Sequence, residues 1–174
     1  LVGSEMCIRD RFYRDVRISK IWEGTNGIQA LDLAGRKITQ DFGKNLRHLL
    51  WPMTDFIEEN RKNAEMAEFT KPLHQGVKGL QQLTLLMISS GMANPNFLAS
   101  GATDYCRYFG NVLIGYMWAR IASVCLEKKN DTFYGAKLAS ARFFFQRIYP
   151  ETFGLAARIQ SGPKPLMEYP TEMF

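Results

Sequence analysis

The stretch Glu23-Gly24-Thr25-Asn26-Gly27 places a carboxylate, two glycines and two helix-capping residue types within five positions. Glycine permits backbone angles that other residues resist, and threonine and asparagine are favoured at the residue before a helix. We therefore expect a tight turn that ends in a helix N-terminus. Such a terminus has unpaired N–H groups and the positive end of the helix dipole, which suits a phosphate, a carboxylate or a polarised carbonyl.

The same five residues also have a purely structural explanation. A glutamate just before a helix is a favourable charge near the positive end of the dipole, and Thr25 or Asn26 can cap a helix without binding any ligand. Capping does not exclude contact with a cofactor. These local features therefore leave both readings of Glu23 open, as a catalytic group and as a stabilising charge.

Helical patterns lie on both sides of this turn. The residues from Phe12 to Ile21 have the pattern of the end of a helix, with Phe12 and Val16 on one face. After the turn, residues 27–40 predict an amphipathic helix. Its expected buried face is formed by Ile28, Leu31, Ala34, Gly35 and Ile38.

The rest of the chain predicts an antiparallel bundle of about four long helices and no strands, so the fold class is all-α. A kink or a restart is expected at Trp51-Pro52, and a bend at Pro150, because proline interrupts the helical hydrogen bonds. Asn130-Asp131 is expected to cap the last helix, and the tail from Leu166 to Phe174 is expected to be an extended strap. The helices are predicted at 44–67, 70–91, 98–129 and 131–160.

Composition limits the possible functions. The chain has 174 residues, of which 46% are hydrophobic, enough for the core of one modest domain. Its net charge of +5 comes from basic residues scattered singly, which argues against a nucleic-acid partner. Cys106 and Cys125 share one predicted helix about 28 Å apart, beyond disulfide reach, which suits a reducing, cytoplasmic setting. With two histidines and no ligand cluster, no metal site is predicted.

The first eleven residues are expected to be foreign to the protein. LVGSEMCIRDR matches one reading frame of a transposase adaptor used in sequencing libraries, and a match of that length is too long for chance. We therefore exclude residues 1–11 from the fold, as one would an expression tag. On this interpretation Cys7 has no biological meaning and native sequence is missing upstream.

The segment Arg14–Lys37, RDVRISKIWEGTNGIQALDLAGRK, resembles the acyl-CoA dehydrogenases in its order of arginine, aspartate, isoleucine, aromatic residue and Glu-Gly-Thr. The runs ANPNFLASGATDYCRYFGNVLIGYMWAR, DTFYGAKLASARFFFQRIYPE and LMEYPTEMF resemble the extra C-terminal helical domain of the larger bacterial members. The resemblance implies that residues 12–41 end the flavin-binding helical domain of that family. Residues 42–174 are then the extra helical-bundle domain with its tail.

This resemblance implies an FAD-dependent enzyme that forms a trans-2-enoyl-CoA. It implies that Glu23 is the base that removes the α proton while the β hydride passes to flavin, and that its own N–H binds the thioester oxygen. Because a thioester α proton is weakly acidic, the base needs a raised pKa in a dry pocket. Gly24 is then a substrate-binding residue, and Thr25, Asn26 and Gly27 are cofactor-binding residues.

Two positions depart from the family pattern. Trp22 stands where many relatives have tyrosine, which keeps an aromatic wall but alters the room for the acyl chain. Gly27 stands where well-known medium-chain members have glutamine, so only its backbone is left to contact a cofactor. We therefore rank Gly27 below Thr25 as a site residue.

The resemblance also implies partners. These are an acyl-CoA substrate, electron-transfer flavoprotein and a second copy in a homodimer, with no nucleic acid and at most a weak membrane association. The pathway that the resemblance implies is fatty-acid β-oxidation in a bacterial cytoplasm. The 174 residues alone are expected to be inactive. A non-catalytic oligomerisation or interaction module and an acyl-CoA oxidase stay open as alternatives, as does the choice between long-chain and methylthiopropionyl-CoA substrates.

Overall fold

The computed structural model describes residues 10–21, 25–40, 43–128, 130–168, 170 and 172. Across these residues the chain is helical with no strand, which confirms the all-α prediction. The elements are α2 (Asp10–Val16), the 3₁₀ turn η2 (Arg17–Lys20), α3 (Asn26–Asp32), the π-helical segment η3 (Leu33–Lys37), α4 (Lys44–Glu59), α5 (Ala67–Ala93), α6 (Pro95–Leu126), α7 (Thr132–Phe143), the π-helical segment η4 (Phe144–Ile148), α8 (Glu151–Ser161) and α9 (Lys164–Met167).

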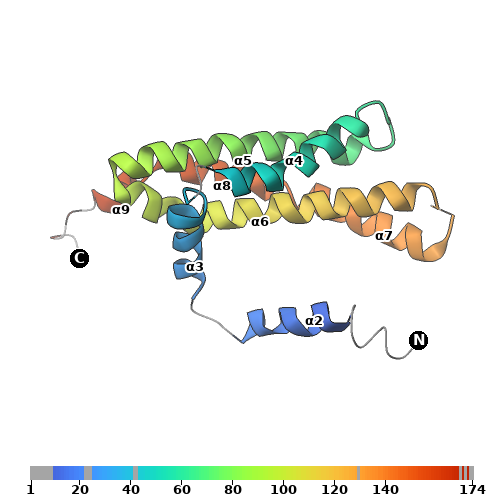
Figure 1. The fold of residues 1–174 in the computed structure, drawn as a ribbon, viewed down its shortest axis with the longest axis horizontal. Coiled ribbons are helices and arrows are strands. Elements are labelled where there is room, and N and C mark those ends of the chain that lie inside the picture. The colour runs from blue at the N-terminus through green and yellow to red at the C-terminus, as the bar shows by residue number, and fades with distance from the viewer. Residues whose placement is uncertain are drawn as a thin grey trace.

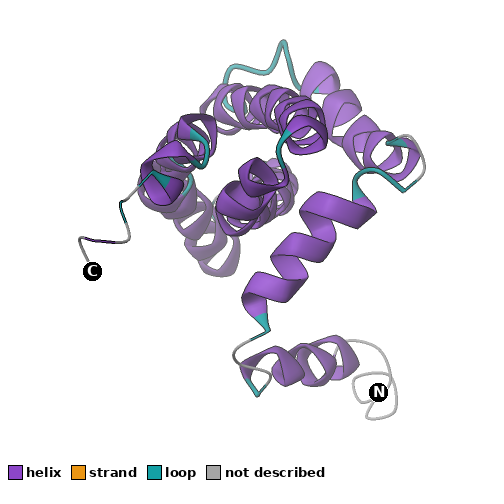
Figure 2. Cartoon of the chain, turned by 90° about the vertical axis from the view of Figure 1, so that its left-hand side faces the viewer, coloured by secondary structure: helices purple, strands orange, loops and turns teal. Residues whose placement is uncertain are grey.

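The long helices form an up-and-down bundle around α6. Helices α5 and α6 run antiparallel along the long axis, and α7 and α8 return beside α6 (Figure 1). Helix α4 packs on α5, and α3 packs across α6. Figure 2, turned so that the long helices are seen nearly end on, shows α2 lying apart from them. The predicted bundle of long antiparallel helices is therefore present in the described residues.

Helix α6 is the one helix of the described residues that is long and apolar enough to cross a membrane. Of its most apolar window, 39% is buried inside the fold. Its contacts with α3, α5, α7 and α8 are those of a central bundle helix.

Two glycines make room for a buried aromatic ring in the middle of the bundle. Tyr149 is 2% exposed, and a Cβ added at Gly76 on α5 would lie 1.9 Å from its hydroxyl. A Cβ added at Gly115 on α6 would lie 2.5 Å from its ring. The Tyr149 hydroxyl finds no hydrogen-bond partner within the described part of the chain. Tyr149 therefore locks α5, α6 and α8 together by shape alone, with an unsatisfied polar atom inside.

Two neighbouring tyrosines in the core have satisfied hydroxyl groups. Tyr105 on α6 shares a hydrogen bond of 2.6 Å with Thr84 on α5. Tyr108 donates to the carbonyl of Gly76 at 3.1 Å. Because both bonds are buried, they fix the register of α5 against α6 as well as stabilising it.

Several predicted helix boundaries need correction. Helix α4 continues through Pro52 without a restart. Helix α5 begins at Ala67 and not at Thr70, because the Asn63 side chain accepts hydrogen bonds from two N–H groups just before it, and Pro72 falls inside its first turns. Helix α6 begins at Pro95, where Asn94 is the N-cap. Asp131 does cap α7, as predicted.

The last predicted helix is interrupted near its middle. It is divided into α7 and α8 by the π-helical segment η4 and the turn at Tyr149-Pro150. The bend was expected at Pro150, and the wider helical turn starts six residues earlier at Phe144. The extra residue of this turn brings Phe144 and Phe145 together into the core with Tyr149.

The predicted faces of the N-terminal helices were partly wrong. Phe12 and Val16 are 73% and 66% exposed, so the expected face of α2 has no partner in the described residues. On α3, η3 and the residue after them, the buried residues are Ala30, Ala34 and Ile38, whereas Ile28, Leu31 and Gly35 are exposed. Small alanines allow α3 to approach α6 more closely than leucine or isoleucine would.

The tail differs from the expected strap. After Gly162, whose φ of 68° ends α8, the chain forms the short helix α9. Leu166 and Met167 are 67% and 61% exposed. The part of the tail that the structure describes therefore does not cover the bundle.

Candidate functional site

The candidate site lies at the start of α3, and three of its five predicted residues are within the described residues. Glu23, the predicted base, and Gly24, the predicted substrate contact, lie outside them together with Trp22. Thr25, Asn26 and Gly27 are described. The predicted roles of all five residues stay predictions.

Thr25 is the N-cap of α3, as the residue types indicated. It is half-buried, and its carbonyl accepts a hydrogen bond of 2.9 Å from the Gln29 N–H. Its side chain makes no capping hydrogen bond. The N–H groups of the first turn therefore have no acceptor within the helix and no cap from the Thr25 side chain. Such groups are the ones that a helix N-terminus offers to an anion.

Asn26 and Gly27 form the exposed first turn of α3. A Cβ added at Gly27 would meet no atom within 4 Å, and the residue does not have a positive φ. Packing therefore does not require glycine at this position. The open space leaves the backbone of the turn accessible from outside.

The turn is held in place by the other end of the same helical run. Ala30, Ala34 and Ile38 are buried against the bundle, and a Cβ at Gly35 would lie 3.5 Å from Leu98 at the start of α6. Asp32 accepts hydrogen bonds from Arg36, one of them 2.9 Å long. The bond to Arg36 lowers the pKa of Asp32. The buried alanines and Ile38 anchor α3 on the bundle, and α3 projects from α6 (Figure 1).

The bundle brings no second set of chemical groups to this turn within the described residues. No group of three or more His, Cys, Asp or Glu there could hold a metal ion. His48 and His74 are both exposed, as expected. Cys106 and Cys125 lie on one helix and are both free thiols.

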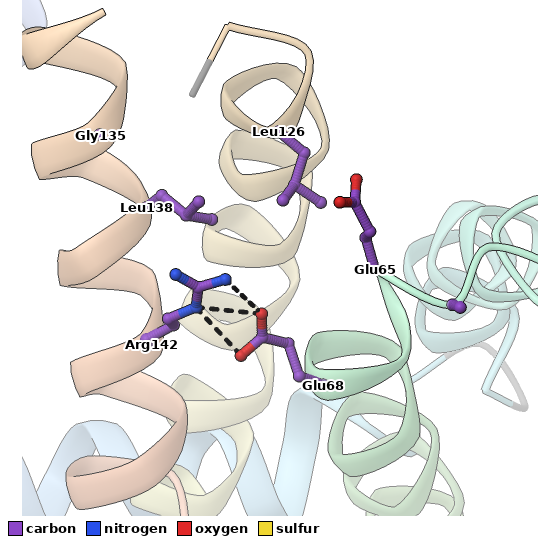
Figure 3. A pocket seen from close by; sticks show the side chains of 7 residues that line it. Glu65, Glu68, Leu126, Gly135, Leu138 and Arg142 are labelled. Carbon is purple, nitrogen blue, oxygen red and sulfur yellow. Dashed lines mark hydrogen bonds and ion pairs between the residues drawn. The ribbon is translucent and has the colours of Figure 1, made fainter. Parts of the chain in front are cut away.

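A hollow of about 400 Å³ lies between the start of α5 and α7 (Figure 3). Arg142 on α7 points across it and binds Glu68 on α5, with its Nη2 2.8 Å from Oε1. This hydrogen bond raises the pKa of Arg142. The Arg142–Glu68 ion pair connects α7 to α5, and each charge is neutralised by the other. We therefore assign this hollow a structural role.

A larger hollow of about 640 Å³ lies between the turn after η3, the start of α4 and the outer face of α5. Sequence reasoning missed it. Apolar residues at helical spacing predict a buried face, and nothing in that spacing shows that one end of the face stays uncovered. The residues lining it are Ile38, Thr39, Gly43, Leu46, Arg47, Leu50, Gln81, Thr84, Leu85, Ile88 and Met92.

Part of the chain matches a known protein family. A family described as "Acetyl-CoA dehydrogenase C-terminal like" matches residues 49–170. The matched region runs from the first half of α4 to the tail beyond α9. It thus contains the whole bundle except the start of α4, and it leaves out the turn at the start of α3.

Individual relatives extend the match toward the N-terminus. A butyryl-CoA dehydrogenase of Syntrophomonas wolfei is 27% identical over 91% of this chain and 27% of its own length. The broad-specificity linear acyl-CoA dehydrogenase FadE5 of Mycobacterium tuberculosis is 24% identical over 95% of this chain and 29% of its own. The 3-methylmercaptopropionyl-CoA dehydrogenase of Ruegeria pomeroyi is 30% identical over 86% of this chain and 26% of its own.

These alignments have two consequences. An alignment over 91% of 174 residues leaves out fewer than 17 of them, so the first relative is aligned across the Glu23–Gly27 stretch. The chain spans only a quarter to a third of the length of the relatives it matches. Because this chain corresponds to only part of each relative, the activity of those whole proteins can be transferred to it only as a proposal.

Proposed function

The chain belongs to the acetyl-CoA dehydrogenase C-terminal-like family, and from that premise we propose that it forms the C-terminal part of an FAD-dependent acyl-CoA dehydrogenase. The proposed reaction removes the α proton and the β hydride of an acyl-CoA and leaves a trans-2-enoyl-CoA. The observation that carries the proposal is the Glu-Gly-Thr sequence at residues 23–25, which lies inside the region aligned with named acyl-CoA dehydrogenases.

Glu23 is the proposed catalytic base. Its carboxylate takes the α proton of the thioester, and its backbone N–H donates to the thioester oxygen on which negative charge develops. Gly24 allows the acyl-CoA to approach the backbone closely because it has no side chain. The positive end of α3 adds a favourable field for that developing charge.

The start of α3 fits an anionic cofactor such as FAD. The absence of a cap from the Thr25 side chain, the exposed Asn26 and the open space at Gly27 suit N–H donation to a diphosphate. FAD, when bound, supplies the acceptor for the β hydride. Thr25, Asn26 and Gly27 are the residues of this chain proposed to hold it.

The bundle has a positioning role in this proposal. Helix α3 is anchored on α6, and α6 is enclosed by α5, α7 and α8. The described part of the proposed cofactor-binding turn, Thr25 to Gly27, therefore lies at the start of a helix that is anchored on the bundle. We also propose an acyl-CoA substrate, electron-transfer flavoprotein as the electron acceptor, a homodimer and a cytoplasmic location, as the family resemblance implies.

The test uses the longer protein that carries this chain. Replacing Glu23 by glutamine keeps the shape of the side chain and removes the base, so acyl-CoA-dependent bleaching of the flavin should fall by about 10²- to 10⁴-fold. The FAD content should stay unchanged. Glu127→Gln at the exposed end of α6 is the matched control and should bleach at the normal rate. Normal bleaching by the Glu23 variant would refute the assignment.

A further inference from the structure

The helical run from Asn26 to Lys37 contains one turn that is wider than an α-helical turn, the π-helical segment η3. The Ile38 N–H donates to the Leu33 carbonyl at 3.2 Å, five residues back, where an α-helix reaches back four. Lys37 Nζ lies 3.6 Å from Oδ2 of Asp32, an ion pair with the same spacing of five. A wider turn of this kind amounts to one extra residue inside an α-helix, and such turns are frequent at functional sites.

The extra residue accounts for the face that α3 buries. Successive residues of an α-helix are about 100° apart around its axis, so one extra residue rotates everything before it by about 100°. Counted back from the buried Ile38 with that rotation, Ala30 faces the bundle, while Leu31 and Ile28 face away. The exposed fractions agree with this count, since Ala30 is 1% exposed, Leu31 42% and Ile28 67%.

Without the extra residue, the same sequence has a different buried face. In a continuous α-helix Leu31 lies about 20° from the direction of Ile38, and Ala30 moves to about 80° from it. Ile28 turns from the opposite side of the helix to about 80° as well. This is the face that the apolar spacing alone predicts. The wider turn favours close packing of a small alanine, and the continuous helix favours burial of a larger apolar area.

We propose that η3 is a register switch, through which α3 rotates by about 100° around its own axis as the wider turn forms and is lost. In the state that the structure shows, Ala30 is buried and Lys37 pairs with Asp32. In the other state the helix is continuous, and Leu31 takes the place of Ala30 against the bundle. The rotation carries Asn26 and Gly27 around the helix axis, so the first turn of α3 presents a different side in each state. The proposal does not depend on dehydrogenase activity.

The first test is nitrogen-15 relaxation dispersion on the 174-residue chain, which detects exchange on the microsecond-to-millisecond timescale of a helix register shift. The amides of residues 26–37 should exchange at one common rate with a minor state of about 1–10%. The amides of α7, which lies toward the other end of the bundle, should not show this exchange (Figure 1). Absence of exchange in residues 26–37 overturns the proposal.

Deletion of one residue tests the wider turn itself. Removing the exposed Lys37 leaves a continuous α-helix that keeps Ala30 on the buried face, so the exchange should disappear. Removing Lys62, an exposed residue in the turn after α4, is the matched control and should leave the exchange unchanged. Exchange that persists without Lys37, or that is lost equally without Lys62, contradicts a switch at η3.

A substitution at the buried alanine tests the rotation. Ala30→Gln brings a long polar side chain to a position that is 1% exposed, so it should favour the other state. The Leu31 methyl groups should then become about threefold less accessible to a soluble gadolinium chelate, as expected when the state that buries them becomes the main one. Ala136→Gln, at an exposed alanine of α7, is the control and should leave Leu31 accessible. Unchanged accessibility of Leu31 in Ala30→Gln, or loss of helical chemical shifts from residues 26–32, overturns the proposal.

Discussion

Two glycines of α6 provide a matched pair for testing the packing around Tyr149. A Cβ added at Gly115 would lie 2.5 Å from the Tyr149 ring, while a Cβ added at Gly110 would meet no atom within 4 Å. Both residues lie inside the same long helix. The same substitution, glycine to alanine, should therefore have opposite effects at the two positions.

The expected magnitudes follow from two opposing contributions. Alanine is preferred over glycine in a helix by about 0.8–1.0 kcal/mol, and both variants gain this. Forcing an extra methyl group into a packed core costs about 1–3 kcal/mol, and this cost applies to Gly115→Ala alone. The ring of Tyr149 cannot move aside freely because Gly76 contacts it from the other helix. Gly115→Ala should thus be less stable than Gly110→Ala by about 2 kcal/mol.

The assay is thermal and urea unfolding of the 174-residue chain, followed by circular dichroism at 222 nm. A difference of about 2 kcal/mol corresponds to about 4–8 °C in melting temperature for a domain of this size. Gly110→Ala should melt above the parent chain. If Gly115→Ala is as stable as Gly110→Ala, the tight contact between Tyr149 and α6 is wrong.

Three further predictions concern the cap of α7, the start of α3 and the buried tyrosines. Asp131→Ala removes the side chain that accepts from the Phe133 N–H at 2.8 Å and should cost about 1 kcal/mol in urea unfolding; an unchanged midpoint would contradict the cap. Gly27→Gln should fold with stability equal to or up to about 1 kcal/mol above the parent, because its Cβ meets open space, and a loss of stability would contradict that geometry. Burial raises the pKa of Tyr105 to about 12. Unfolded tyrosines lose their proton first, near pH 10, so stability should fall as pH rises from 10 to 12, by at most about 1.4 kcal/mol per pH unit for this group. Tyr105→Phe should make that decline shallower when urea midpoints are compared at pH 9 and 11, and an identical decline would contradict the shift.

Much of the bundle was predictable because its core follows a simple spacing. Leu73, Val77, Leu80, Thr84 and Met87 recur in the sequence at steps of three and four, which predicts one face of a helix, and all five are buried. The spacing of apolar residues predicts the buried face of α5 correctly because one side of that helix faces the centre of the bundle. The cap at Asp131 was predictable for an equally local reason, since the side chain bonds to N–H groups two and three residues ahead.

Features that depend on neighbouring helices were not predictable from spacing. The apolar pattern after the turn places Ile28 and Leu31 on the buried face with Ala34, but the closeness of α3 to α6 buries Ala30 and Ala34 and leaves Ile28 and Leu31 exposed. The role of Gly115 becomes visible only when Tyr149 from another helix lies against it. The apolar hollow was missed because each of its walls, taken alone, has the pattern of a core helix. Glu23 and Gly24 lie outside the described residues, so their roles remain predictions.

The central claim is that Glu23 removes the α proton of an acyl-CoA. The most direct measurement is mass-spectrometric detection of deuterium entering the α carbon of an acyl-CoA when the longer protein is incubated with it in deuterated water without an electron acceptor. The parent protein should exchange the α hydrogen, and the Glu23→Gln variant should exchange it about 10²- to 10⁴-fold more slowly while retaining FAD. Exchange at the parent rate by the Glu23→Gln variant would contradict the account.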